Sequence, residues 1–285
     1  MRRREALTGF ALTLPAIAGM CVFFIVPFGI CIYYSLTSGI YNPKFVGLAN
    51  YISVFNSAAF RLAAWNTFRF LFTAVPLIMV VSLLIALILF EKLKGFNFFR
   101  TVFIFPLVLP VASVVMFFQI VFSNQGIVNA ILTALHLPVT DWLNSPGAFW
   151  VLVLLYVWKN MGYNIILFMA ALNSIPKNML EAAKIDGAGR FGTLFRVSLP
   201  LIVPYIFFIL MISIINSFKS FREAFMLCGA HPNQSIYMLQ HFVYNNFMNL
   251  NYLHLSVAAI SIFIVVFAMV FVLYWIKNKM GSYEL

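Results

Sequence analysis

Long apolar runs alternate with short polar stretches along this chain, and these runs are the first guide to its fold. Six of them are long enough to cross roughly 30 Å of hydrocarbon as helices that rise about 1.5 Å per residue. We place them at residues 9–35, 67–90, 101–122, 149–172, 201–218 and 256–276. The pattern predicts an all-α, polytopic membrane protein with one transmembrane domain over residues 1–285. Prolines within the runs predict kinks in a packed bundle; they lie at positions 15, 27, 76, 106, 110 and 204.

A charged stretch, Glu181–Pro200 (EAAKIDGAGRFGTLFRVSLP), separates the fourth and fifth apolar runs. Pro176 before it and the final Pro200 predict that the stretch continues neither neighbouring helix. Gly187 and Gly189 interrupt two short segments whose apolar residues have helical spacing. We therefore expect a helix, a glycine turn and a second helix outside the bilayer, within a loop over residues 174–200.

The composition agrees with a membrane protein, because the chain is 64% hydrophobic and only 9% charged, against roughly a quarter in soluble proteins. The net charge of +11 does not indicate nucleic-acid binding, since the basic residues stand singly at the ends of apolar runs. Most of the basic residues lie near the two termini, in the loop over 174–200 and within residues 92–100. The opposite ends carry Lys44, Arg61, Lys219 and Arg222, with Arg69 just inside the second run. The excess of basic residues predicts that both termini and the charged loop face the cytoplasm.

Several kinds of chemistry are missing. No phosphate-binding P-loop motif occurs, and the four histidines, His136, His231, His241 and His254, are assigned to solvated outer loops without metal-ligand spacing. We place no carboxylate inside a span and assign Glu223 to a loop, whereas ion-driven carriers usually need an ionisable group at membrane depth. We therefore expect no catalytic residues, no metal site and no bound cofactor, and any driving force must come from a partner.

Lys159 is the clearest anomaly inside a predicted span, where a lysine costs roughly 2.5–3.5 kcal/mol. It either reaches out of the span or is neutralised against helix carbonyls, or it faces a hydrated cavity, and the sequence leaves both alternatives open. Asn160, Tyr163 and Asn164 follow it on one helical face. Such a strip joins helices at about 0.6 kcal/mol per hydrogen bond or binds hydroxyl-rich solutes, and we favour binding.

A second polar cluster lies at the end of the fifth apolar run, over residues 213–222. Asn216 and Ser220 share one helical face, as do Ser213 and Ser217. The nearby Lys219 and Arg222 are explained by a helix end that approaches water. Gln119, alone in the third run, is expected to hydrogen-bond to another helix.

The charged loop also carries a family motif. Glu181-Ala182-Ala183, Gly187 and Val197-Ser198-Leu199-Pro200 resemble the EAA---G---------I-LP signature of permease subunits in binding-protein-dependent ABC importers, with valine for the usual isoleucine. Asp186-Gly187-Ala188, Gly47–Tyr51, Asn66-Thr67 and Trp158–Tyr163 are similar to the carbohydrate branch, which includes the maltose and multiple-sugar permeases.

This resemblance implies the type I importer architecture, in which six transmembrane helices carry a cytoplasmic coupling helix. That helix docks on partner ATPase subunits, which bind ATP and magnesium. It further implies a second, distinct permease subunit, an outer solute-binding protein and a bacterial or archaeal cell membrane. The residues that match the ATPase-coupling positions are Glu181, Ala182, Ala183, Asp186, Gly187, Leu199 and Pro200. Lys177 and Lys184 lie at helical spacing around Glu181, so we expect them to bracket it.

The spans on either side of the loop line the substrate cavity in the sugar branch. Carried over, the substrate-pathway residues are Lys159, Asn160, Gly162, Tyr163, Asn164, Asn216, Ser217 and Ser220. The first hypothesis is a permease subunit of a sugar or oligosaccharide importer. Two alternatives stay open: an importer of glycerol phosphate or another anionic solute, with Lys159 and Lys219 as its partners, and a membrane docking or signalling protein that uses the charged loop.

Overall fold

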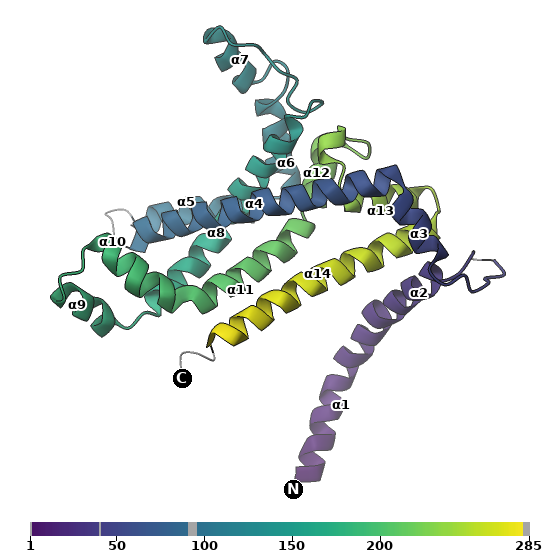
Figure 1. Cartoon of the computed structure of the whole chain (residues 1–285), viewed down its shortest axis with the longest axis horizontal. Coiled ribbons are helices and arrows are strands. Elements are labelled where there is room, and N and C mark those ends of the chain that lie inside the picture. Colours follow the sequence, from purple (N-terminus) through teal and green to yellow (C-terminus); the bar gives the residue numbers. More distant parts are fainter. Residues whose placement is uncertain (1, 40, 91–95, 282–285) are drawn as a thin grey trace. The chain divides into compact units, whose positions relative to one another are not determined.

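Helices make up the regular structure of the parts that the computed structural model describes, residues 2–39, 41–90 and 96–281 (Figure 1). Outside the helices, a single isolated bridge between Thr37 and Phe45 adds extended pairing within those ranges. The all-α prediction is confirmed. Glu91, Lys92 and Lys94, which the sequence places at the end of a span, lie outside the described residues.

Five helical stretches are long and apolar enough to cross a membrane, and a bent pair of helices makes a sixth if counted as one span. The helices of these spans are α1 (Arg2–Met20), α2 (Val26–Ser35), α4 (Ala58–Phe90), α5 (Phe96–Val108), α6 (Val111–Val121), α8 (Ala148–Asn173), α11 (Leu199–Phe218) and α14 (Tyr252–Gly281). The shorter helices are α3 (Ala49–Asn56), α7 (Ile127–Ala134), α9 (Lys177–Ile185), α10 (Arg190–Thr193), α12 (Phe221–Cys228) and α13 (Leu239–Met248). Each of the six predicted spans is therefore found, with ends that differ by several residues.

The third span is broken rather than kinked. Helices α5 and α6 meet at an angle of 102° (Figure 1). Pro110 stands at the N-cap of α6 in an extended conformation, with ψ at 137°. Because proline lacks an N–H and disfavours helical geometry in the residue before it, the helix ends ahead of Pro110 and restarts in a new direction.

Two π-helical turns precede prolines. Residues Cys21–Ile25 come just before Pro27, and residues Leu194–Ser198 come just before Pro200. In the second turn the Leu199 N–H bonds to the Leu194 carbonyl, one residue further back than in an α-helix. The prediction that Pro200 closes the charged loop is wrong, because this widened turn lets residues 190–228 run on as one helical span.

The chain divides into two compact units, 1–61 with 242–264, and 62–241 with 265–285. In the first unit, Asn50 at the start of α3 ties down the end of α2. Its amide donates to the carbonyls of Ser35 at 3.0 Å and Thr37 at 2.8 Å. Gly47 just before α3 has a φ of +57°, which glycine adopts at little cost.

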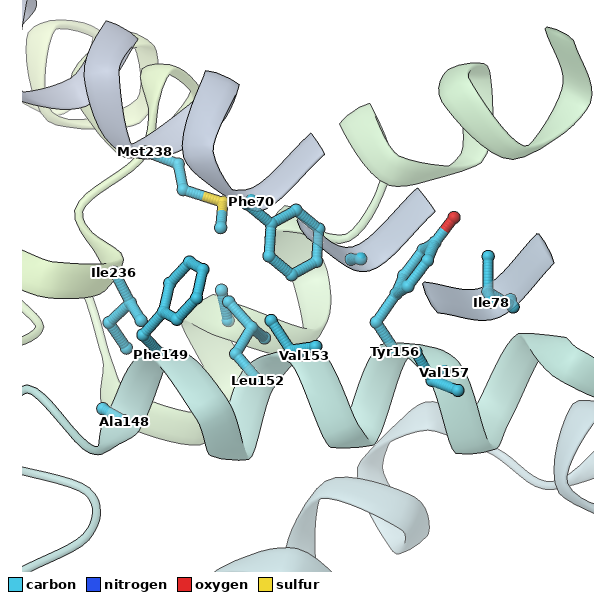
Figure 2. Close-up of a cluster of buried hydrophobic side chains, with 12 residues drawn as sticks. Phe70, Ile78, Ala148, Phe149, Leu152, Val153, Tyr156, Val157, Ile236 and Met238 are labelled. Carbon is cyan, nitrogen blue, oxygen red and sulfur yellow. The ribbon is translucent and has the colours of Figure 1, made fainter. Parts of the chain in front are cut away.

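In the second unit, α8 is the most buried helix, and it packs against α5, α6, α11 and α12. Figure 2 shows one of its clusters, in which Phe149 and Tyr156 of α8 meet Phe70 of α4. The centroids of the Phe70 and Tyr156 rings are 5.4 Å apart in an edge-to-face arrangement, one of the geometries that aromatic pairs prefer. These contacts bury the first half of α8 in the core of this unit, and the polar residues from Lys159 to Asn164 follow on the same helix.

Candidate functional site

The charged loop is a helical elbow. Helix α9 ends with Asp186 as its C-cap, and Gly187 follows with a φ of +77°. The Gly187 N–H bonds to the Lys184 carbonyl at 3.1 Å, and the Ala188 N–H bonds to the Ala183 carbonyl at 2.9 Å. This pair of bonds is a Schellman motif, which needs a left-handed residue at the glycine position. The glycine turn predicted from the sequence is therefore present.

The two arms of the elbow contact each other, because α9 packs against α10 and against the π-helical turn 194–198. Ala183 is buried in this packing, while Glu181, Ala182, Asp186 and Gly187 are exposed. Leu199 is half-buried and Pro200 is exposed at the beginning of α11. The elbow thus brings the motif residues into one continuous piece of structure and leaves most of them free for a partner.

Apolar side chains also point outward from the elbow. Ile185 is 86% exposed, and Phe191 is 79% exposed. Met179 and Phe195 add further exposed apolar area. If this loop stands in water, as its charges predict, such a group of side chains is typical of a protein-binding surface.

The expected bracket of lysines around Glu181 is not formed. Glu181, Lys177 and Lys184 are all exposed, and among the described residues the Glu181 carboxylate has no ion-pair or hydrogen-bond partner. Exposed pairs of this kind gain little, because water and lost side-chain freedom cancel most of the attraction. The carboxylate is available to a partner instead.

A cavity of about 630 Å³ lies in the second unit, where the break between α5 and α6 faces α8, α11 and α12. Its walls carry five of the predicted substrate-pathway residues, namely Lys159, Asn160, Tyr163, Asn216 and Ser220. Leu107, Leu109 and Val111 from the broken span supply apolar wall. The cavity therefore joins both predicted polar clusters at one place.

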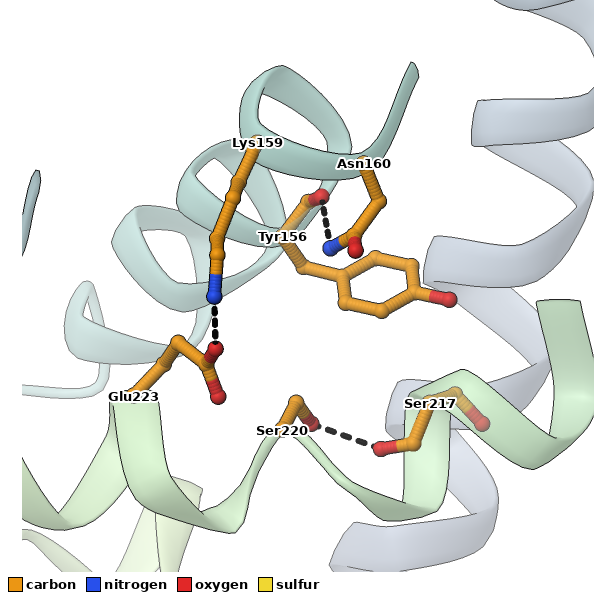
Figure 3. A network of polar contacts seen from close by, with 6 residues as sticks. All are labelled: Tyr156, Lys159, Asn160, Ser217, Ser220 and Glu223. Carbon is orange, nitrogen blue, oxygen red and sulfur yellow. Dashed lines mark hydrogen bonds and ion pairs between the residues drawn. The ribbon is translucent and has the colours of Figure 1, made fainter. Parts of the chain in front are cut away.

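Lys159 and Glu223 form a buried ion pair beside this cavity (Figure 3). Only 7% of Lys159 and 6% of Glu223 is exposed. The assignment of Glu223 to a loop is wrong, since it lies in α12, on the helical span 190–228. Lys159 lines the cavity, as the second alternative expects, but its charge is met by the Glu223 carboxylate and not by the helix carbonyls that the first alternative named.

The remaining predicted pathway residues take part in packing. Adding a Cβ to Gly162 would bring it within 2.0 Å of the Phe103 carbonyl oxygen, so α5 and α8 touch there. Asn164 donates to the Ser213 hydroxyl at 2.9 Å and joins α8 to α11. Ser217 is buried and donates to the Ile214 carbonyl. None of these three lines the cavity, and their part in a substrate pathway stays a prediction.

Other polar groups order the wall. Asn160 donates to the Tyr156 carbonyl at 2.8 Å, and Ser220 donates to the Ser217 carbonyl (Figure 3). The Tyr156 hydroxyl, which the sequence did not single out, donates to the Ser213 carbonyl at 2.9 Å. Gln119 behaves as expected, since its amide donates to the Met226 and Leu227 carbonyls of α12. The bonds of Asn160 and Ser220 are local to one stretch of helix, whereas those of Tyr156 and Gln119 join different helices, and hydropathy alone reveals neither kind.

Comparisons with known proteins agree with this geometry. Residues 78–281 match the family described as "Binding-protein-dependent transport system inner membrane component". The chain is 33% identical to the probable ABC transporter permease protein YesP of Bacillus subtilis, over 79% of this chain and 74% of that protein. It is 30% identical to the trehalose/maltose transport system permease protein MalF of Thermococcus litoralis, over 97% and 95%. It is 33% identical to the sn-glycerol-3-phosphate transport system permease protein UgpA of Salmonella choleraesuis, over 73% and 72%.

A solved structure shares the fold. A chain of a bacterial alginate ABC transporter, crystallised in complex with an alginate pentasaccharide-bound periplasmic protein, matches with a TM-score of 0.84 and 20% identity. The match covers 98% of this chain and 96% of that one. The family match, the identities and the shared fold lead to one conclusion. This chain is a multi-pass membrane protein of the binding-protein-dependent transport system inner membrane component family.

Proposed function

We propose that the chain is the permease subunit of an ATP-driven importer that carries a sugar or oligosaccharide into the cell. The observation that carries this proposal is the elbow, which presents Glu181, Asp186 and Gly187 together with exposed apolar side chains. A rigid elbow between α8 and α11 can transmit the movement of a docked partner to two helices that line the cavity. The permease itself needs no nucleotide site for this.

The proposed assembly follows from the family and its relatives. Two cytoplasmic ATPase subunits dock on the elbow and hydrolyse ATP with magnesium. A second permease subunit completes the pathway, and an extracytoplasmic solute-binding protein delivers the ligand. The solved alginate transporter, which was crystallised with a periplasmic binding protein, supports the last partner. Both termini face the cytoplasm in this arrangement, on the same side as the elbow.

The relatives support a carbohydrate as the substrate. Their names include trehalose and maltose, glycerol phosphate and, for the solved structure, alginate. Asn160, Tyr163 and Asn216 supply amide and phenol groups to the cavity, and such groups can donate to and accept from sugar hydroxyls. A docking or signalling role without transport would leave this polar cavity unexplained.

The elbow can be tested by substitution. Glu181→Lys reverses an exposed charge at the docking surface, and Gly187→Pro cannot adopt the required positive φ. We expect both variants of the complete transporter to reach the membrane but to lose most ATP-driven uptake. Gly187→Asn should keep much of the activity, because asparagine tolerates the left-handed conformation.

A matched control reverses a charge elsewhere. Asp141 is exposed in a loop that we place on the opposite side of the membrane, so Asp141→Lys should leave uptake close to wild type. Normal uptake by both Glu181→Lys and Gly187→Pro would contradict the proposed coupling.

A further inference from the structure

The cavity carries more positive than negative charge. Its charged wall residues are Lys159, Lys219, Arg222 and Glu223, three cations and one carboxylate. Glu223 is engaged by Lys159, so these two charges largely cancel. The positive surplus therefore comes from Lys219 and Arg222.

Lys219 and Arg222 have no acidic partner among the described residues, and both are exposed. Lys219 is the C-cap of α11, and Arg222 is in the first turn of α12. Two residues lie between them at the turn from α11 to α12, and both Lys219 and Arg222 line the same cavity. Two unpaired cations in a partly apolar recess attract an anion more strongly than they would on an open surface.

The other polar residues of the cavity wall can hydrogen-bond to the hydroxyl groups of a sugar. Asn160, Tyr163, Asn216 and Ser220 offer donors and acceptors for hydroxyl groups. A volume of about 630 Å³ is within the usual range of roughly 300–1,000 Å³ for small-molecule sites. The alternative is that Lys219 and Arg222 only anchor the span at the membrane surface. That role would not explain why both line the same cavity as the groups that can bind hydroxyls.

We propose that this cavity selects carbohydrates that carry an anionic group, a carboxylate or a phosphate ester, which Lys219 and Arg222 contact. This inference rests on the proposed function and adds the charge of its substrate. Arg222 binds a planar carboxylate or a phosphate through two parallel N–H donors, while Lys219 supplies a mobile point charge. Lys159 offsets the charge of Glu223, so this carboxylate does not strongly repel an anion in the cavity.

Matched ligand pairs test the proposal on the detergent-solubilised complex of both permease subunits and the ATPases, without the solute-binding protein, so that ligand binds to the membrane complex alone. One pair is a galacturonate disaccharide and its uncharged methyl ester, and another is glucose 6-phosphate and glucose. Equilibrium binding is measured for the wild type, for Lys219→Gln/Arg222→Gln and for the control Lys44→Gln/Arg61→Gln. The control removes two positive charges from residues that do not line the cavity.

We expect wild type and control to bind at least one acidic ligand about tenfold or more tightly than its neutral partner, as the loss of a charge-assisted contact implies. The cavity double variant should lose that preference and keep its binding of the neutral ligands. A galacturonate-only or a phosphate-only preference identifies which anion is recognised.

Other outcomes overturn the proposal. A wild type that prefers the neutral partners, or a cavity variant that keeps its acidic preference, shows that the two cations do not select the ligand. Equal loss of acidic and neutral ligands shows that they serve the structure instead. A transporter that neither binds nor takes up any carbohydrate contradicts the proposed function itself, so the two failures are distinct.

Discussion

At the scale of single residues, the buried pair of Lys159 and Glu223 shows both the reach and the limit of sequence reasoning. Lys159 stood out because a lysine inside an apolar run is costly. Its partner lies 64 residues further on, at a place that looks like the end of a span. Nothing in local spacing connects the two, since only tertiary packing of α8 against α12 brings them together.

Removal of either charge should destabilise the protein strongly. Lys159→Ala or Glu223→Ala leaves the other charge buried and unpaired, which typically costs about 3–5 kcal/mol. The exchange Lys159→Glu/Glu223→Lys should recover part of that loss. Melting temperature in detergent and the amount of protein in the membrane measure the effect. Lys44→Ala, an exposed control, should change stability by less than about 0.5 kcal/mol, and single variants as stable as that control would disprove the pairing.

Gly162 is expected to tolerate no side chain. A Cβ there would overlap the Phe103 carbonyl and come within 3.1 Å of the Ile104 Cα, and a backbone cannot swing aside as a flexible side chain can. Gly162→Ala should therefore separate α5 from α8 and lower the melting temperature. Gly29 is the matched control, because a Cβ added there would meet nothing within 4 Å and alanine favours a helix by roughly 0.5–1 kcal/mol over glycine. Equal melting temperatures for the two variants would argue against close packing at Gly162.

His241 shows a second limit, because its assignment to a solvated loop is wrong and its side chain is fully buried. Its Nδ1 accepts the Met238 N–H at 3.2 Å. Burial, together with the charge of nearby His231, lowers the pKa of His241 to about 4. Polar residues near it predicted a wet loop, whereas the contacts with Phe221 and Tyr237 that bury it come from other segments.

The lowered pKa predicts acid sensitivity. The folded protein favours neutral His241, while the unfolded chain takes up a proton near pH 6.5. The stabilisation is complete above pH 6.5 and is lost as the pH falls towards 4, by up to about 1.4 kcal/mol per pH unit. His241→Asn retains an acceptor for the Met238 N–H and should flatten the fall of melting temperature over this range. The exposed control His136→Asn should keep the wild-type slope, and an unchanged slope in His241→Asn would rule the histidine out.

At the scale of elements, hydropathy located every span. A segment that crosses lipid on its own must be a helix, because only a helix satisfies its own backbone polar groups, and its side chains must be apolar over the whole crossing. Prolines were harder to interpret. Pro110 breaks a span through 102°, whereas Pro200 is absorbed by a π-helical turn. The same missing N–H therefore has two outcomes: α5 and α6 contact α8 on both sides of the break, whereas the turn before Pro200 contacts α9 and α11. The glycine turn was predictable, since a Schellman motif is a local structure.

The apolar side chains of the elbow lead to a prediction about partner binding. Ile185 and Phe191 are strongly exposed, and the removal of such anchors from an interface often costs more than 1 kcal/mol each. Ile185→Ser/Phe191→Ser should reduce co-purification of the ATPase subunits and the ATP hydrolysis that ligand stimulates. Leu137→Ser is the control, because Leu137 is an exposed apolar residue in the loop before α8 that we place outside the cell. Undiminished co-purification of the double variant would exclude this surface as the docking site.

At the scale of the whole molecule, the question is where the driving force enters. The sequence argued against an ion-coupled mechanism because no carboxylate was placed inside a span, but Glu223 lies in α12, on the helical stretch 190–228 that continues from the fifth span. Proton carriers do use ionisable residues within their membrane spans. In this chain, however, Glu223 forms an ion pair with Lys159 at the wall of the cavity, so its carboxylate is already engaged within the protein.

We therefore expect the purified permease pair in proteoliposomes to accumulate no carbohydrate under an imposed proton or sodium gradient. The complete transporter, with ATPases, ATP and the solute-binding protein, should accumulate it without any gradient. Glu223→Gln keeps the shape of the side chain but removes the carboxylate that could exchange protons. In assemblies that still fold, this variant separates ATP-driven from gradient-driven uptake. ATP-dependent uptake should then persist at a reduced rate, because glutamine leaves the Lys159 charge unpaired but still offers it a hydrogen-bond acceptor. Gradient-driven uptake by the permease pair alone, abolished by Glu223→Gln, would instead make the buried glutamate the coupling residue and the elbow secondary.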